Sequence, residues 1–171
     1  MNGNLRNMTS LYLRSGNEML LLYRIGSKVI ADSYTASAGG HFEKEELNDA
    51  RACVLRELRE ETGLCEENIR NLSLRYVTLR LKNGEIRQNY YFFADVADRS
   101  KAMTSSEGRL KWFRMEELPD VMSEMPFTAR YVVEHYLEIG KNTDVLYAGA
   151  ATESGVVFTE MKEFCNCNAD M

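Results

Sequence analysis

The hydrophobic pattern changes sharply between residues 49 and 64, and this change constrains the fold more than any other feature of the sequence. On both sides of the segment, apolar and polar residues alternate over short runs, as in strands. Within it, ARACVLRELREETGL places Ala50, Val54 and Leu58 on one stripe at helical spacing, and Gly63 follows as the C-terminal cap. An amphipathic helix between groups of strands buries its stripe against a sheet. The sequence therefore predicts a layered domain of the α/β or α+β class.

Two β-hairpins are predicted, one on each side of this helix. The first joins residues 9–14 to 19–23 around Gly16, and the second joins 72–81 to 85–96 through Lys82-Asn83-Gly84, where Asn-Gly is a strong turn signal. The remaining elements are strands at 33–37 and 110–115, an amphipathic helix at 128–139, and two edge strands at 145–148 and 156–161.

The length and composition are those of a single folded domain over residues 1–171, with 44% hydrophobic and 27% charged residues. The 26 acidic and 21 basic residues give a net charge of −5, which does not attract a polyanionic duplex. We therefore expect no nucleic-acid polymer as a partner. The first twenty residues lack the apolar core of a secretory signal, and the most apolar run, 19–23, is too short to span a bilayer. We expect a cytoplasmic protein with no membrane partner, and the oligomeric state stays open, a homodimer included.

The cysteines do not form a disulfide framework for a core of this size. They are Cys53, Cys65, Cys165 and Cys167. Because the chain has only two histidines, a zinc site would need the Cys-Asn-Cys pair and distant partners. Reduced thiols without a metal are expected.

Three carboxylates border the apolar stripe of the predicted helix. Since each helical residue turns by about 100°, Glu57, Glu60 and Glu61 lie within about 100° of one another. Like charges at this spacing cost a few tenths of a kcal/mol per pair. A hard cation such as Mg²⁺ or Mn²⁺ would offset this cost, because it prefers oxygen ligands. Most Glu-rich helix faces are simply solvated, so the helix alone leaves both interpretations open.

The residues around the helix favour the metal site. Gly40 and Glu46 fit the pattern G-x5-E, and residues 56–64 (RELREETGL) fit R-E-U-x-E-E-x-G-U at every specified position, where U is aliphatic. In this segment the chain resembles the Nudix hydrolase family, whose signature joins these two halves through seven residues. The strands before the segment and the long hairpin after it agree with this resemblance.

The chain departs from the signature between its two halves. Nine residues, 47–55, stand where the family has seven. A loop longer by two residues before the helix would absorb the difference. The departure leaves Glu43 and Glu45 as alternatives to Glu46 for the supporting glutamate of the loop.

The resemblance implies an α/β/α sandwich around a mixed sheet, and hydrolysis of a nucleoside diphosphate linked to another moiety with the help of Mg²⁺ or Mn²⁺. A pyrophosphate repels a nucleophile, so cations must neutralise it and orient the attacking water. The implied metal ligands are Glu57 and Glu61, with the Gly40 carbonyl added from the loop. Glu60 is implied as a third ligand or as the base. Arg56 would hold Glu57 and a loop glutamate in place.

Further candidates lie outside the signature. Glu107, before the strand at 110–115, is a candidate additional base or ligand, as in similar enzymes, and the alternative is an ordinary loop carboxylate. Along residues 85–96, alternation sends Arg87, Asn89 and Tyr91 to one face and Tyr90 to the other. Because Asn89 offers a donor and an acceptor and a tyrosine offers a stacking surface, the pocket-facing set is expected to contact a purine base.

The leading hypothesis is a MutT-like enzyme that cleaves a purine nucleoside triphosphate, oxidised ones such as 8-oxo-dGTP included, to the monophosphate and pyrophosphate. One alternative is an ADP-ribose or nucleotide-sugar pyrophosphatase. Such relatives carry a proline about sixteen residues past the signature, and here no proline precedes Pro119. Another alternative is a metabolite sensor without catalysis, but such proteins usually lose the glutamates that are all present here.

Overall fold

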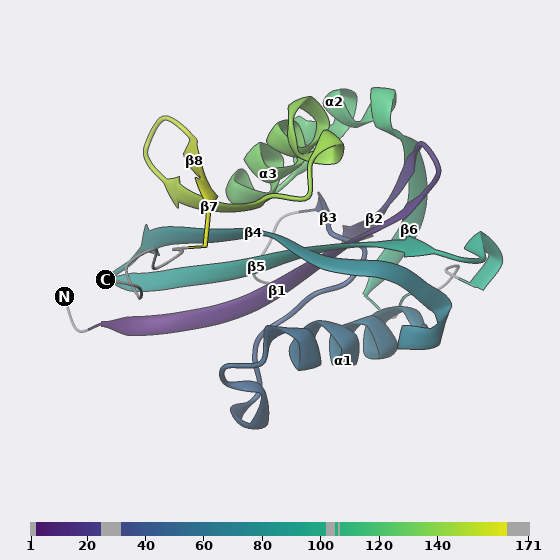
Figure 1. Cartoon of the computed structure of the whole chain (residues 1–171), viewed down its shortest axis with the longest axis horizontal. Coiled ribbons are helices and arrows are strands. Elements are labelled where there is room, and N and C mark those ends of the chain that lie inside the picture. Colours follow the sequence, from purple (N-terminus) through teal and green to yellow (C-terminus); the bar gives the residue numbers. More distant parts are fainter. Residues whose placement is uncertain (1–2, 25–31, 102–104, 106, 164–171) are drawn as a thin grey trace, which may run out of the picture.

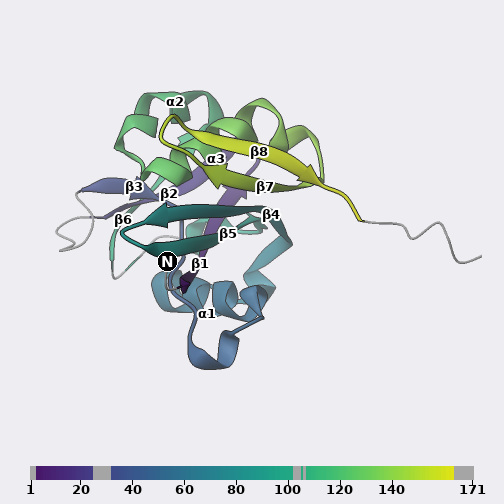
Figure 2. The ribbon, with the colours of Figure 1, turned by 90° about the vertical axis from the view of Figure 1, so that its left-hand side faces the viewer.

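The computed structural model describes residues 3–24, 32–101, 105 and 107–163. Within them a mixed sheet lies between α1 on one face and α2 and α3 on the other (Figure 1). The view in Figure 2 shows the same three layers from the side. The strands are β1 (Asn4–Ser15), β2 (Glu18–Arg24), β3 (Ser33–Thr35), β4 (Ile69–Lys82), β5 (Glu85–Val96), β6 (Gly108–Arg114), β7 (Leu146–Ala151) and β8 (Val156–Met161). The helices are α1 (Ala50–Thr62), α2 (Leu118–Val121) and α3 (Phe127–Glu138).

The strand order is β3-β2-β1-β5-β4-β7-β8, and β6 pairs with β2. At the centre β1 runs parallel to β5, and Met8 lies opposite Asn89. β4 and β7 are also parallel, whereas the other strand pairs are antiparallel. The mixed sheet and its helical layers confirm the predicted fold class.

Local signals in the sequence account for α1. The Asp49 side chain accepts a hydrogen bond from the Ala52 N–H at the first turn, and Gly63 closes the last turn with φ 72°, a left-handed conformation that glycine adopts without strain. Val54 and Leu58 are fully buried in a cluster with residues of β1 and β5. This apolar contact fixes α1 on the sheet, as predicted.

Both predicted hairpins are present. In the second, Asn83 and Gly84 have φ values of 54° and 77°, as a two-residue turn between twisted strands requires. The expectation that residues 145–148 form an edge strand is wrong, because β7 pairs with β4 on one side and with β8 on the other. The short apolar run of residues 145–148 does not show that β8 pairs with β7 on the side away from β4. The four-residue α2 was not predicted, since it is too short to show a helical period.

A second apolar cluster fills the space between the sheet and α3. Tyr91 and Phe93 of β5 contribute to it with Val132 and Tyr136 of α3, and the rings of Phe93 and Tyr136 are stacked 4.1 Å apart. Cys53 and Cys65 are free thiols, whereas the other two cysteines lie outside the described residues. No helix in the described part of the chain is long and apolar enough to cross a membrane.

Candidate active site

Arg56 connects the glutamates of the signature. Its Nε and Nη2 atoms donate to the two carboxylate oxygens of Glu46 at 2.6 and 2.9 Å, a bidentate pair. Its Nη1 atom donates to Glu57 Oε1 at 2.8 Å and to Glu60 Oε2 at 2.9 Å. The Arg56 guanidinium lowers the pKa of Glu46 to about 2. One cation therefore fixes a loop carboxylate and two helix carboxylates relative to one another.

The longer loop keeps Glu46 in contact with Arg56. Glu46 is buried at the end of a short 3₁₀ turn, whereas Glu45 is exposed and the Glu43 carboxylate is 4.0 Å from Arg56 Nε. After this turn Leu47 is 54% exposed and Asn48 adopts φ 74°. Among the three loop glutamates, Glu46 makes the hydrogen-bonded contact with the Arg56 guanidinium.

Two carboxylates of α1 lie against the glycine segment before the loop. The Gly39 N–H donates to Glu61 Oε2 at 2.8 Å. A Cβ atom on Gly40 would lie 2.2 Å from Glu57 Oε1, so only glycine leaves room for this carboxylate. Both carboxylates are on the border of the buried face, as predicted, with exposures of 9% for Glu57 and 7% for Glu61.

Burial makes these two charges unfavourable without a cation. It raises the pKa of Glu57, and it raises the pKa of Glu61 to about 7. The expectation that Glu60 also borders the buried face is wrong, because its side chain is 56% exposed and pairs with Arg56. At about 100° per residue, Glu60 lies roughly 120° around the helix from Val54. As placed in the described residues, no three His, Cys, Asp or Glu side chains form a ready metal-binding group.

The donor set nevertheless fits Mg²⁺, which usually takes one or two carboxylates and completes its shell with water and substrate phosphates. Glu57 and Glu61 supply two such carboxylates beside Gly39 and Gly40. The Gly40 carbonyl already accepts the Thr9 N–H at 2.8 Å, so one of its two lone pairs remains for a cation.

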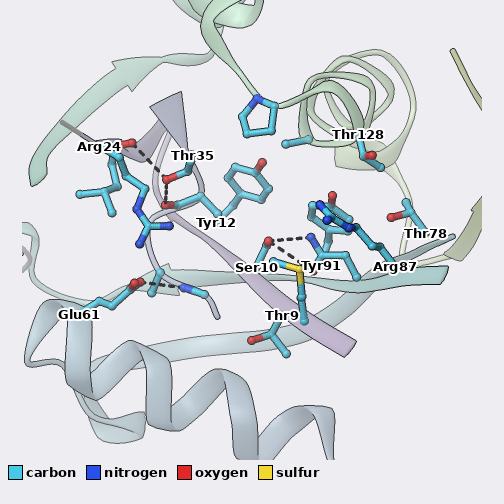
Figure 3. A pocket seen from close by; sticks show the side chains of 18 of the residues that line it. Thr9, Ser10, Tyr12, Arg24, Thr35, Glu61, Thr78, Arg87, Tyr91 and Thr128 are labelled. Atoms are coloured by element: carbon cyan, nitrogen blue, oxygen red, sulfur yellow. Dashed lines mark hydrogen bonds between the residues drawn. The ribbon is translucent and has the colours of Figure 1, made fainter. Parts of the chain in front are cut away.

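A cavity of about 200 Å³ opens beside the Glu61 side chain, which lines it. It lies between the sheet and the start of α3, and Glu61 reaches it at Gly39 from α1 (Figure 3). Its polar lining includes Ser10, Arg24, Thr35, Thr78, Arg80, Arg87, Asn89 and Thr128.

The predicted substrate-binding residues all line this cavity. Arg87, Asn89 and Tyr91 face it, whereas Tyr90 points to the α1 side and packs 5.5 Å from the Phe42 ring. The Asn89 amide donates to Ser10 Oγ at 3.0 Å. Tyr91 is 2% exposed and stacks with Tyr12, and burial raises its pKa to about 12. These contacts establish which strand face meets the cavity, a point that alternation alone left open.

Glu107 does not line the cavity. It forms an ion pair with Arg24, which does line it. Register places Arg24 opposite Gly108, next to Glu107. Sequence reasoning missed Arg24 and the β4 residues Thr78 and Arg80, since no motif marks them and only long-range pairing brings them to the cavity.

Known proteins resemble this chain in domain family and in fold. The family model described as the NUDIX domain matches residues 5–136. No curated protein matches the chain. Among solved structures, a mutator MutT protein from Bacillus halodurans is 19% identical with a TM-score of 0.63, and the alignment covers 91% of this chain and 97% of that one. A NUDIX hydrolase from Nitrosomonas europaea is 18% identical with a TM-score of 0.66, covering 88% and 81%. An Ap4A hydrolase from C. elegans is 16% identical with a TM-score of 0.63, covering 81% and 99%. At these identities the structural likeness shows the shared fold.

Proposed function

Since this chain belongs to the Nudix family and is a Nudix pyrophosphohydrolase, we propose that it cleaves a purine nucleoside triphosphate to the monophosphate and pyrophosphate. The observation that carries the proposal is the position of the buried Glu61 carboxylate at one end of a cavity that Asn89 and Tyr91 line, one helical turn from the buried Glu57 carboxylate. One ligand can place its diphosphate at the carboxylates and its base in the cavity.

The glutamates supply the metal site of this proposal. Glu57, Glu61 and the Gly40 carbonyl would hold Mg²⁺ or Mn²⁺, with Glu60 as a third ligand or as the base. The cation, when bound, neutralises the diphosphate and orients the attacking water. Arg56 keeps the Glu57 carboxylate in one orientation through its bond at 2.8 Å.

Proton transfer from the attacking water requires a carboxylate within hydrogen-bond reach of it. Glu60, 56% exposed at its side chain, accepts this proton in the proposed mechanism. Glu107 is a second candidate base, because its ion pair with Arg24 places it beside a residue of the cavity.

The base-binding part rests on the polar wall of the cavity. The Asn89 amide can present both a donor and an acceptor to a purine edge. Arg87 adds donors that suit base or phosphate oxygens. The small-molecule partner is thus a nucleotide, while cytoplasmic location and a homodimer stay predictions.

The test compares kcat/KM for dGTP, 8-oxo-dGTP, dCTP and ADP-ribose at fixed Mg²⁺. We expect dGTP or 8-oxo-dGTP to be the best substrate. If dCTP or ADP-ribose were best by tenfold or more, about 1.4 kcal/mol of transition-state discrimination, the substrate assignment would be wrong. Glu57→Gln should abolish activity on all four. Glu67→Gln, which changes an exposed glutamate beyond α1, is the matched control.

A further inference from the structure

Three arginines lie in one row across the central strands. In the register of the sheet, Arg6 of β1 pairs with Arg87 of β5, and Arg80 of β4 pairs with Arg87 from the other side. Residues directly opposite one another share a face of the sheet, so the three positive charges lie on the same face. Like charges in such pairs destabilise a sheet. This row is therefore unfavourable unless an anion offsets it.

The protein itself offsets only part of this charge. The Glu85 carboxylate lies 2.9 Å from Arg87 Nε and 3.9 Å from Arg6 Nη1. Within the described part of the chain Arg80 makes no ion pair, and its guanidinium lies 4.9 Å from the centre of the Phe127 ring. Arg80 and Arg87 both line the cavity. One carboxylate against three guanidinium groups leaves an excess of positive charge there.

Two further features of the cavity wall favour a ligand that accepts hydrogen bonds. The first turn of α3, next to Arg80, has no side-chain cap and no acidic residue, so its free N–H groups add partial positive charge. Tyr12 lines the cavity, and its buried hydroxyl has no hydrogen-bond partner among the described residues. A buried donor without a partner is costly, and a ligand oxygen would satisfy it.

The arginine pair is distant from the carboxylates. The segment 38–41 pairs with β1 through the Thr9 N–H and the Gly40 carbonyl, and β5 and β4 follow in order. At roughly 4.8 Å per strand, the backbone of β4 lies roughly 14 Å from the glycine segment beside Glu61. Figure 3 shows Glu61 and Arg87 at opposite sides of the cavity. The two ends therefore contact different parts of one ligand.

We propose that Arg80 and Arg87 form a second anion subsite, which holds a phosphoryl group that the substrate carries apart from its scissile diphosphate. The inference rests on the proposed function and narrows its substrate class. The extra phosphoryl group belongs either to the sugar of the nucleotide or to a longer phosphate chain. Guanidinium groups suit this ligand, because their planar array of donors matches phosphate oxygens.

The experiment measures equilibrium binding, which does not depend on hydrolysis. Guanosine 3′,5′-bisphosphate is compared with guanosine 5′-monophosphate, and guanosine 5′-tetraphosphate with GTP, by calorimetry in the presence of Ca²⁺. We expect at least one pair to differ tenfold or more in Kd, and the pair that differs identifies the source of the phosphoryl group. In Arg80→Gln and in Arg87→Gln, the ratio of the two Kd values within that pair should fall to about one. Arg80→Lys, which keeps the charge, should recover part of it.

Arg70→Gln is the matched control, since it removes an exposed arginine from the same strand, and it should keep the wild-type ratio.

A ratio near one for both pairs in the wild type would overturn the subsite. If neither Arg80→Gln nor Arg87→Gln changes the Kd ratio, the phosphoryl group is not held at these two arginines. In both cases, Mg²⁺-dependent hydrolysis of GTP would still support the proposed function. If no nucleotide binds or is hydrolysed, the proposed function fails and the subsite fails with it. If one of the two glutamine variants does not fold, the Kd ratio measured with the other tests the position of the subsite.

Discussion

Glu61 is a buried carboxylate whose negative charge a bound cation would compensate. Its carboxylate is 7% exposed, accepts one hydrogen bond from the Gly39 N–H, and lies near the Glu57 charge. In the metal-free protein this arrangement disfavours the ionised form. The residue is therefore placed at some cost to the stability of the empty site, as expected for a group whose role is to bind a ligand.

Replacement of this carboxylate should separate stability from activity. With a chelator at pH 8, Glu61→Gln should melt at a higher temperature than the wild type, because a buried charge is removed while an acceptor for Gly39 remains. Its turnover with Mg²⁺ should fall by at least about 100-fold, and Mg²⁺ should no longer raise its melting temperature. Thermal melts and initial rates check both effects. Near-normal turnover would show that Glu61 is not a metal ligand.

Gly40 tests how closely the loop must approach α1. In Gly40→Ala the new methyl group would overlap Glu57 Oε1, the carboxylate oxygen that Arg56 also holds. We expect a folded protein whose kcat falls at least tenfold, with a weaker response to Mg²⁺, because Glu57 must move. Circular dichroism and steady-state rates are the measurements. A variant with unchanged kcat would show that the Glu57 carboxylate can move without loss of function.

At the residue scale, the sequence singled out the helix glutamates because Glu57, Glu60 and Glu61 stand at fixed spacing on one predicted helix. It did not specify Arg24 or Arg80, which reach the cavity through pairings with distant strands. Nor did it resolve which loop glutamate meets Arg56. That depends on how the chain turns after Glu46, and two extra residues can be absorbed at several points of a loop.

Among the elements, the loop before α1 differs most from the family pattern. Deletion of Leu47 and Asn48 would restore the family spacing. Leu47 is 54% exposed, so its removal leaves no cavity, and the Asp49 cap remains. We expect a folded protein with some activity, destabilised by roughly 1 kcal/mol for the lost hydrogen bond between Asp49 N–H and Glu46 O. Urea unfolding measures this difference. An unfolded product would mean that the loop has a second structural role.

The contact of α3 with the sheet should depend on pH through His135. The ring Nδ1 lies 3.0 Å from the Tyr76 hydroxyl, and burial lowers the pKa of His135. The folded state thus favours the neutral ring. Its contribution to stability is present above the usual histidine pKa and is lost as the pH falls through the lowered value.

His135→Gln keeps an acceptor for Tyr76 and cannot be protonated, so its melting temperature should fall less than that of the wild type between pH 7.5 and pH 5. Parallel melts across this range are the measurement. An equal fall in the two proteins would assign the acid sensitivity to other groups.

The elements that the sequence predicted well are those with local signals. The α1 helix has a period and two caps, and the second hairpin has Asn83 and Gly84 at its turn. No local signal in the sequence shows which strands pair with one another. The position of β7 inside the sheet depends on β4, far away in the chain, and on β8 covering its other side.

At the scale of the whole molecule, β1 holds the two halves of the sheet together. It pairs with β2 on one side and with β5 on the other, and its residues Leu11, Tyr12 and Leu13 enter both apolar clusters. A chain that begins at Asp32 would lack this strand, so we expect it to stay unfolded. Adding residues 1–31 as a separate peptide should restore the native circular dichroism spectrum. A folded fragment without the peptide would refute the central role of β1.

The parallel pairing of β1 with β5 also affects how the protein is made. Ser10 and Asn89, which meet in this pair, are 79 positions apart in the chain. During synthesis at about 5–20 residues per second, the first strands leave the ribosome roughly 4–16 s before their central partner exists. Through that interval β1 can pair with β2, but its other edge has no β5 to pair with. A nascent chain of this topology therefore carries an unpaired strand edge until β5 has been made, and such an edge is prone to aggregation.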